Sequence, residues 1–287
     1  MFPHGLGTAL ITPFKTNKEV DYEALERLLD LQLQGGTDYL VVLGTTGEAA
    51  TLTDTEKDEV QRFIVQKVAG RLPLVLGVGG NNTALVCEQA RKVDTAAFSA
   101  ILSVCPYYNK PNQEGLFQHF SAIAQASPLP IILYNVPGRT GVNLLPETVL
   151  RLHQAFPSTI IGIKEASGNF PQITHLINLF KNNTAFSVIS GDDAIAAELM
   201  HVGAVGLISV ASNAWPLWVA DILRNHDAST PSAFAQRVSL LFQEGNPTGI
   251  KAVLSQMGLI QNVLRLPLVP ASAELQEKLH TATIDRT

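Results

Sequence analysis

The sequence predicts an α/β protein built as a (β/α)8 TIM barrel with a C-terminal helical appendage, and three observations support this fold. Short runs of β-branched and other apolar residues recur along the chain, without the alternation of a half-exposed strand, which is typical of parallel strands buried on both faces. Segments with helical periodicity separate these runs. We count eight strand and helix units, the number that closes a barrel.

The predicted strands are Gly7–Thr12, Tyr39–Leu43, Leu74–Val78, Ala100–Cys105, Ile131–Asn135, Ile160–Glu165, Ser187–Ser190 and Val205–Val210. Helical periodicity is clearest at Tyr22–Gln34, Thr55–Val68 and Gln113–Ala126, where apolar residues recur every three or four positions. The second of these helices begins at a capping box, because Thr53 stands three residues before Glu56.

A doubly wound open sheet is the structural alternative, and it should show a Gly-x-Gly-x-x-Gly fingerprint after its first strand. The nearest match, Gly77–Asn82, follows the third strand and ends in Asn82 instead of glycine. After about residue 225 the strand pattern stops while helical segments continue. We therefore expect a barrel over residues 1–225 and a helical region over residues 226–287.

Composition excludes several classes of protein. With 46% hydrophobic and 16% charged residues among 287, the chain can build a large core. Its 20 Lys and Arg against 25 Asp and Glu give a net charge of −5 without a basic cluster, so nucleic acid is not an expected partner. No apolar run approaches the roughly 20 residues that span a bilayer, and the N-terminus resembles no signal peptide, so we expect a cytoplasmic protein.

The chemistry of such a barrel belongs to the C-terminal ends of its strands. Lys164 lies inside the sixth predicted strand, Ile160–Glu165, with Ile161, Ile163 and Ala166 nearby. Because an apolar setting makes a charged amine costly, Lys164 is a candidate nucleophile of the Schiff-base type. The alternatives are a lysine that extends to solvent or one that pairs with Glu165. Lys251 also has apolar neighbours, but a solvated or packing role is expected for it.

Hydroxyl and guanidinium groups also fall at strand ends. Tyr107, Tyr108 and Tyr134 could relay protons together with Thr46, whose hydroxyl both donates and accepts; the alternative for each tyrosine is to cap the core. Arg139 lies in a Pro-Gly-Arg-Thr-Gly turn, where its planar fork suits a substrate carboxylate, unless it is a surface arginine.

The cysteines and histidines give no comparable indication of a functional site. The two cysteines, Cys87 and Cys105, show no CxxC pairing, which suits a reducing compartment, and Cys105 is expected to be a core thiol. The seven histidines are scattered without His-x-His or HExxH spacing, so no metal site is predicted.

Five motifs carry a resemblance to a known family. They are Gly44-Thr45-Thr46-Gly47-Glu48, Tyr107-Tyr108-Asn109-Lys110-Pro111, Tyr134-Asn135-Val136-Pro137-Gly138-Arg139-Thr140-Gly141, Gly162-Ile163-Lys164-Glu165-Ala166 and Ser190-Gly191-Asp192-Asp193. In this order and spacing, over nearly the whole chain, the sequence resembles the 4-hydroxy-tetrahydrodipicolinate synthases, the dihydrodipicolinate synthases of bacterial lysine biosynthesis.

This resemblance implies a class I aldolase-type condensation of pyruvate with L-aspartate 4-semialdehyde through a lysine imine, without a metal or organic cofactor. Lys164 matches the family's Schiff-base lysine and Tyr134 the residue that moves protons at the imine. Thr46 and Tyr108 match the rest of the proton relay, with Tyr108 reaching the site of a neighbouring subunit.

The resemblance also implies the substrate-binding residues. Arg139 matches the residue that helps to bind the carboxylate of the aldehyde substrate, Thr45 and the Ile208 carbonyl match positions on the pyruvate side, and Gly191 matches a position that lines the same pocket. The partner subunit needed for Tyr108 implies a homo-oligomer, and we expect a homotetramer made of two dimers.

Two other functions compete with this one. N-acetylneuraminate lyase and the keto-deoxy sugar acid aldolases share the lysine and the tyrosine but generally lack the arginine that stands here as Arg139. A catalytically silent barrel with a binding role would not need Lys164, Tyr134, Thr46 and Tyr108 together.

Feedback inhibition by lysine, which occurs in many members of the family, is expected to be weak or absent. Asn81 and Tyr107 agree with the lysine-binding pattern. The positions that depart from it are Ala49, Asp54, Lys57 and Leu85.

Overall fold

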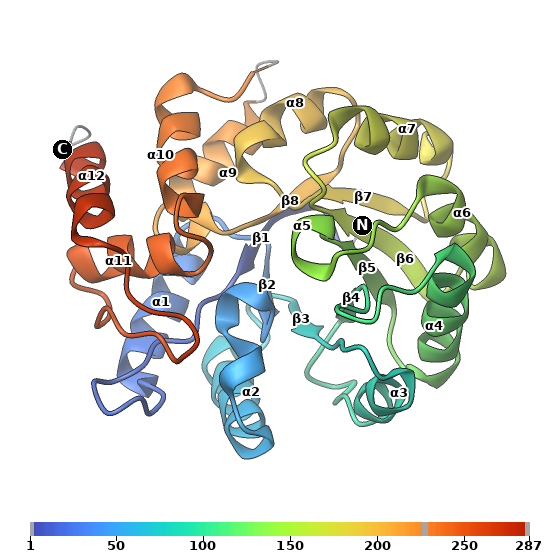
Figure 1. Cartoon of the computed structure of the whole chain (residues 1–287), viewed down its shortest axis with the longest axis horizontal. Helices are drawn as coiled ribbons and strands as arrows, with labels where there is room; N and C mark the ends of the chain where they lie inside the picture. The colour runs from blue at the N-terminus through green and yellow to red at the C-terminus, as the bar shows by residue number, and fades with distance from the viewer. Residues whose placement is uncertain (1–2, 226–228, 285–287) are drawn as a thin grey trace.

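A computed structural model describes residues 3–225 and 229–284 of the chain. Eight parallel strands follow one another around a closed barrel, and the last pairs with the first through Ile208 and Gly7 (Figure 1). The strands are β1 (Gly5–Ala9), β2 (Tyr39–Val42), β3 (Leu74–Gly77), β4 (Ala100–Val104), β5 (Ile131–Asn135), β6 (Ile160–Glu165), β7 (Ser187–Ser190) and β8 (Gly206–Ser209). The predicted TIM barrel is confirmed.

Helices surround the barrel and continue beyond it. They are α1 (Tyr22–Gln34), α2 (Asp54–Val68), α3 (Thr83–Arg91), α4 (Gln113–Ala126), α5 (Pro137–Thr140), α6 (Pro146–Ala155), α7 (Phe170–Phe180), α8 (Ala196–His201), α9 (Pro216–Arg224), α10 (Ser232–Phe242), α11 (Thr248–Gln256) and α12 (Ala273–Ile284). Among the described residues, no helix combines the length and apolar character that a membrane span requires.

Local chemistry sets several boundaries. The capping box at the start of α2 is present, with the Thr53 side chain accepting from the Glu56 N–H and the Glu56 carboxylate accepting from the Thr53 N–H. The first strand ends earlier than predicted, at Ala9, because the N–H of Ile11 donates to the Asn213 side chain at 3.0 Å instead of to a neighbouring strand.

The strands bury both of their faces, which explains their continuous apolar character. One set of side chains fills the barrel interior, and the opposite set packs against the helices. The interior cluster consists of Ala9, Tyr39, Val41, Val75, Ala100, Leu102, Ile132, Tyr134, Val136, Ile189 and Ile208.

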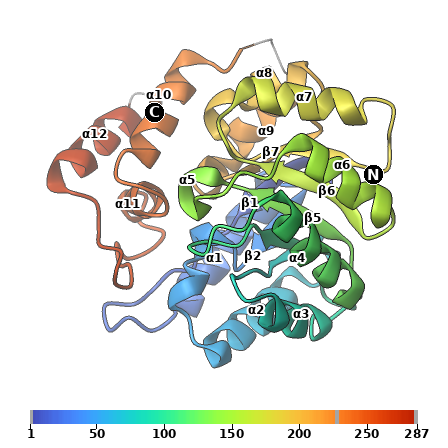
Figure 2. The ribbon, with the colours of Figure 1, turned by 45° about the vertical axis from the view of Figure 1, so that its right-hand side comes forward.

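Helices α10, α11 and α12 lie together at one side of the barrel, across from α3, α4, α6 and α7 (Figures 1 and 2). The segment around α11 contacts the loops that follow β1, β2 and β5, through Leu264, Arg265 and Asn246 respectively. The C-terminal helical region therefore reaches the end of the barrel at which the strands terminate. The predicted boundary between residues 225 and 226 stays a prediction, since residues 226–228 lie outside the described residues.

Candidate active site

Lys164 and Tyr134 lie side by side on neighbouring strands. The two residues are register partners of β5 and β6, so both side chains point to the same face of the sheet. The Lys164 Nζ atom lies 4.4 Å from the centroid of the Tyr134 ring, and both residues are buried, at 5% and 6% exposure. Tyr134 belongs to the interior cluster, so the amine is held inside the barrel near the end of its strand.

The adjacent carboxylate does not serve Lys164. Glu165 points to the opposite face of β6, where it accepts from the Asn135 amide at 3.0 and 3.2 Å and from the Ser167 N–H at 2.8 Å. Burial raises the pKa of Glu165, although these hydrogen bonds and a longer one from Gln172 oppose the rise. The alternative in which Lys164 pairs with Glu165 is therefore wrong.

Gly191 packs closely against the side chain of Lys164. A Cβ atom at Gly191 would lie 2.9 Å from the Lys164 Cε atom and 2.6 Å from the Ala166 Cβ atom. Any side chain at this position would crowd the amine. Ile208, on β8, is fully buried and belongs to the same interior cluster as Tyr134.

Thr46 lies in the turn that follows β2, within a short 3-10 helix over Thr45–Gly47. Its side chain is buried, whereas Thr45 is exposed. The Thr46 Oγ1 atom accepts a hydrogen bond of 2.9 Å from the Nδ2 atom of Asn246. A residue of the C-terminal region therefore contacts the predicted proton relay directly.

Arg139 lies on α5, the short helix that follows β5, and its side chain is exposed. Its Nη2 atom donates to the backbone carbonyl of Asn246 at 3.1 Å, which leaves other N–H groups of the guanidinium for a ligand. Asn246 thus contacts both Thr46 and Arg139.

Tyr108 does not join this group within one chain. It is 88% exposed, in the loop between β4 and α4, and its neighbour Tyr107 is 44% exposed. Asn81 and Asn109 tie this loop to the one after β3, through hydrogen bonds of 3.1 Å to the Tyr107 carbonyl and 3.0 Å to the Asn81 carbonyl. The loop therefore presents the phenol of Tyr108 outward.

A buried ion pair holds the turn that carries Thr46. The carboxylate of Glu48 pairs with the Lys251 amine from α11, and both side chains are fully buried. Lys251 also donates to the Val263 carbonyl at 3.1 Å, and burial lowers its pKa to about 8 although Glu48 opposes the change. Of the two roles expected for Lys251, the solvated one is wrong and the packing one agrees with its complete burial, because the chain folds its α11 segment inward over this turn.

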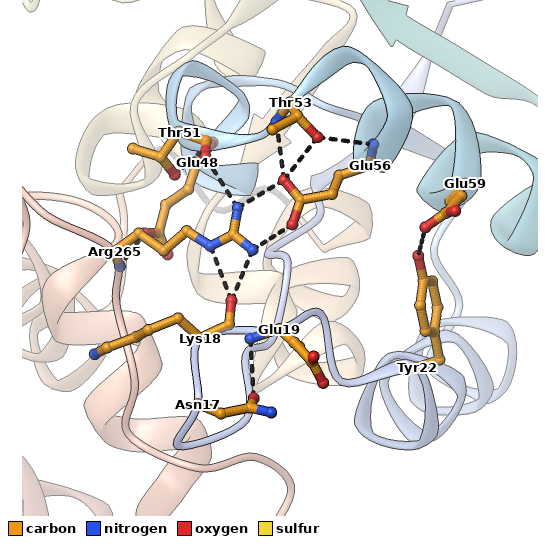
Figure 3. Close-up of polar contacts among 10 residues, drawn as sticks. All are labelled: Asn17, Lys18, Glu19, Tyr22, Glu48, Thr51, Thr53, Glu56, Glu59 and Arg265. Atoms are coloured by element: carbon orange, nitrogen blue, oxygen red, sulfur yellow. Dashed lines mark hydrogen bonds and ion pairs between the residues drawn. The ribbon is translucent and has the colours of Figure 1, made fainter.

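Arg265 extends this connection (Figure 3). Its guanidinium forms two hydrogen bonds with the Glu56 carboxylate, at 2.8 and 2.5 Å, and donates to the carbonyls of Thr51 and Lys18. Its backbone N–H donates to the Glu48 carboxylate at 3.1 Å. One residue therefore joins the loops after β1 and β2 to the C-terminal region.

The remaining candidate groups play no part in this arrangement. Cys87 and Cys105 are free and buried, as expected for core thiols. Among residues 3–225 and 229–284, no group of three His, Cys, Asp or Glu side chains could hold a metal ion.

Sequence reasoning missed Asn246 and the pair of Glu48 with Lys251. Asn246 stands between Gly245 and Pro247, a local pattern typical of a turn, and its contact with Thr46 spans 200 positions of the chain. The sequence offered one signal for the pair: Glu48 is an acid in a strand-end motif, and Lys251 is a lysine with apolar neighbours on a helix. Neither residue indicates its partner by itself.

The interior of this parallel barrel holds a lysine beside a tyrosine near the strand ends. The sequence model of the dihydrodipicolinate synthetase family matches residues 3–285, and the chain belongs to this family of lyase-type, class I aldolase-like barrel enzymes. It acts on small molecules, as the family's enzymes do.

The chain is similar to individual members throughout its length. It is 52% identical to the 4-hydroxy-tetrahydrodipicolinate synthase of Parabacteroides distasonis over 283 residues, which cover 96% of this chain and 94% of that protein. The Acinetobacter baumannii dihydrodipicolinate synthase, solved with pyruvate, is 40% identical with a TM-score of 0.92 and 98% coverage of both chains. A monomeric dihydrodipicolinate synthase variant is 39% identical with a TM-score of 0.93, covering 98% of this chain and 96% of the other.

Proposed function

We propose that the chain condenses pyruvate with L-aspartate 4-semialdehyde, the reaction of the 4-hydroxy-tetrahydrodipicolinate synthases, in the cytoplasm and through an imine between pyruvate and Lys164. The observation that carries this proposal is the buried Lys164 amine, 4.4 Å from the Tyr134 ring centroid, in a barrel interior where Gly191 places no side chain against it. The similarity to named synthases at up to 52% identity supports the substrates.

The proposed reaction begins with the unprotonated amine. Lys164 Nζ adds to the ketone carbon of pyruvate, and water leaves with the ketone oxygen, so that a C=N bond replaces the C=O bond. The imine draws electrons from the methyl group, which loses a proton and gives an enamine. The enamine carbon then bonds to the aldehyde carbon of the second substrate, whose oxygen takes up a proton.

The amino group of the second substrate completes the cycle by displacing Lys164 from the imine carbon, which closes a ring and frees the enzyme. Tyr134 is the proposed acid and base for these proton transfers, and Thr46 and Tyr108 complete the relay. Arg139 binds the aldehyde substrate's carboxylate, Thr45 and the Ile208 carbonyl bind pyruvate, and Gly191 lines the pocket. No cofactor or metal takes part in these proposed steps.

Borohydride trapping tests the central step. With pyruvate present, borohydride should reduce the imine to a stable adduct, and peptide mass spectrometry should find the adduct on Lys164. The Lys164→Ala variant should give no adduct. An adduct on Lys251, the other buried lysine described above, would overturn the assignment. Efficient use of N-acetylmannosamine in place of the semialdehyde would instead favour the sister lyase.

The proposed relay requires a second copy of the chain. Tyr108 is 88% exposed and cannot complete the relay in its own subunit; the exposed Tyr107 lies in the same loop, and Leu85, which is also exposed, lies in the first turn of α3. Burial of this surface against its own copy gives a dimer with two-fold symmetry, and two such dimers give the expected homotetramer. Sedimentation equilibrium should show at least a dimer, whereas an active monomer at assay concentration would exclude this role of Tyr108.

A further inference from the structure

Asn246 is the residue through which the C-terminal region contacts two parts of the site at once. Its side-chain Nδ2 donates to Thr46 Oγ1 at 2.9 Å, and its backbone carbonyl accepts from Arg139 Nη2 at 3.1 Å. It is 7% exposed and lies two residues before the start of α11, the helix that bears Lys251. Hydrogen bonds therefore hold both the side chain and the backbone of Asn246 in place.

The direction of the hydrogen bond matters for Thr46. A hydroxyl has one proton to donate and accepts at its oxygen. When Asn246 supplies a proton to the oxygen, the hydroxyl's own proton remains available for a different partner. A carboxylate in place of the amide would reverse the bond, because it accepts only and would take the proton of Thr46.

We infer that Asn246 is a positioning residue, which orients the Thr46 hydroxyl for proton transfer and fixes the Arg139 side chain at the entrance. This inference rests on the proposed function, since it assumes that Thr46 relays protons. Asn246 acts through Thr46 and Arg139 and needs no contact with substrate. The C-terminal region is then part of the active site and more than an appendage.

A double-mutant cycle separates this role from a general structural one. In the wild-type background, Asn246→Ala should lower kcat by about tenfold or more, within the range of a misplaced proton-transfer group, while KM for pyruvate changes by less than about twofold. In a Thr46→Val background the same change should lower kcat by less than about twofold, because the hydroxyl that it orients is absent. Equal losses in both backgrounds would overturn the inference.

An isosteric variant gives a second readout that does not depend on cavity effects. Asn246→Asp keeps the size of the side chain but donates only when protonated. The ratio of its kcat to that of the wild type should therefore rise as the pH is lowered through the pKa of the new carboxyl group. A ratio that does not change with pH would count against a donating role.

The matched control is Asn262→Ala. The Oδ1 atom of Asn262, like that of Asn246, is buried without a hydrogen-bond partner among the described residues, whereas the hydrogen bonds to Thr46 and from Arg139 described above both involve Asn246. The kcat of the Asn262→Ala variant should equal that of the wild type. Borohydride trapping of the wild type and of each variant distinguishes the two proposals. If Lys164 is trapped but Asn246→Ala lowers kcat equally in both backgrounds, only the role of Asn246 is overturned. If the wild type gives no adduct, the proposed function is overturned and this role with it.

Discussion

Individual residues with unusual backbone angles gather in the loops of the candidate site. Leu43 and Glu48 flank the turn that carries Thr46, with φ of 57° and 50°, and Tyr108 and Lys110 follow β4, with φ of 74° and 45°. L-residues other than Asn and Asp rarely adopt such angles, which cost on the order of 1 kcal/mol or more each. The strain is sustained by the buried partners of Glu48 and by the cross-links between Asn81 and the loop after β4.

Arg139 offers a test of substrate discrimination at the level of one side chain. Arg139→Lys keeps the charge but loses the planar fork that binds a carboxylate through two parallel hydrogen bonds. We expect KM for the semialdehyde to rise by about tenfold, equivalent to about 1.4 kcal/mol, while pyruvate trapping on Lys164 continues. Steady-state kinetics with each substrate varied in turn will measure both effects, and unchanged kinetics would remove Arg139 from the site.

At the scale of elements, the buried pair of Glu48 and Lys251 holds the turn after β2 against α11. Lys251→Met would leave the buried Glu48 carboxylate without its counter-charge and with only the hydrogen bond from the Arg265 backbone N–H, so we expect the free energy of unfolding to fall by about 3–5 kcal/mol. Glu48→Gln combined with Lys251→Met should recover most of this loss, because no isolated charge remains. Urea denaturation at neutral pH will measure these changes.

The control for this pair lies on the surface of α12. Lys278→Met breaks an exposed ion pair with Glu274 and should change the free energy of unfolding by less than about 1 kcal/mol. If the two lysine substitutions proved equally mild, the ion pair of Glu48 with Lys251 would not be what stabilises the turn after β2.

The contact of α2 with Arg265 should make stability depend on pH in the acid range. The hydrogen bonds of Arg265 hold the pKa of Glu56 at about 2, below its ordinary 4.5. Because the folded state binds this proton more weakly, the stabilisation is complete above pH 4.5 and is lost as the pH falls from 4.5 towards 2.

Glu56→Gln should therefore lower the free energy of unfolding at pH 7 by about 1 kcal/mol, a modest value because the pair is partly exposed. It should also reduce the loss of stability between pH 4.5 and the lowest pH at which the protein remains folded. Urea denaturation of the wild type and of Glu56→Gln across this range will measure how the free energy of unfolding changes with pH in each. The same dependence in both would show that other carboxylates dominate the acid transition.

The fold was predictable because its signals are local. A strand such as Ile131–Asn135 is apolar on both faces, and helices such as Tyr22–Gln34 bury one stripe, so each unit indicates its own state from neighbouring residues. Lys164 could be found for the same reason, since a charged group inside an apolar strand is conspicuous in the sequence. Its lack of pairing with Glu165 follows from alternation along the strand.

Asn246 and Lys251 were not predictable as site residues, because their roles depend on contacts across about two hundred positions. An asparagine before a proline has the same local pattern in any turn, and a lysine with apolar neighbours has the same pattern in any amphipathic helix. Only closure of the barrel and the return of α11 to the ends of β1 and β2 bring these residues to Thr46 and Glu48.

At the scale of the whole molecule, the surface residues of α2, α3 and the neighbouring loops bear on the expected weak response to lysine. Lys57 forms an ion pair of 3.1 Å with Asp54, so the carboxylate that could attract a bound ammonium group is already paired. Leu85 is 53% exposed and offers no charge. The amide of Asn81 already donates to the Tyr107 carbonyl.

We therefore expect lysine to inhibit weakly or not at all, because a second ammonium group near Lys57 would be repelled by on the order of 1 kcal/mol. Initial rates measured at saturating substrates across a lysine titration will decide this. Half-maximal inhibition below about 1 mM, a binding free energy beyond about −4 kcal/mol, would show that other residues bind the effector.

The contacts of Asn246 also tie activity to complete synthesis of the chain. Translation proceeds from the N-terminus, so all eight strands, with Lys164 and Tyr134, leave the ribosome before Asn246 does. A chain that is released early, or clipped between α10 and α11, retains Thr46 and Arg139 but loses the residue that contacts both. A partial product therefore cannot assemble the same site. Only a chain synthesised through Asn246 can hold Thr46 and Arg139 in this arrangement.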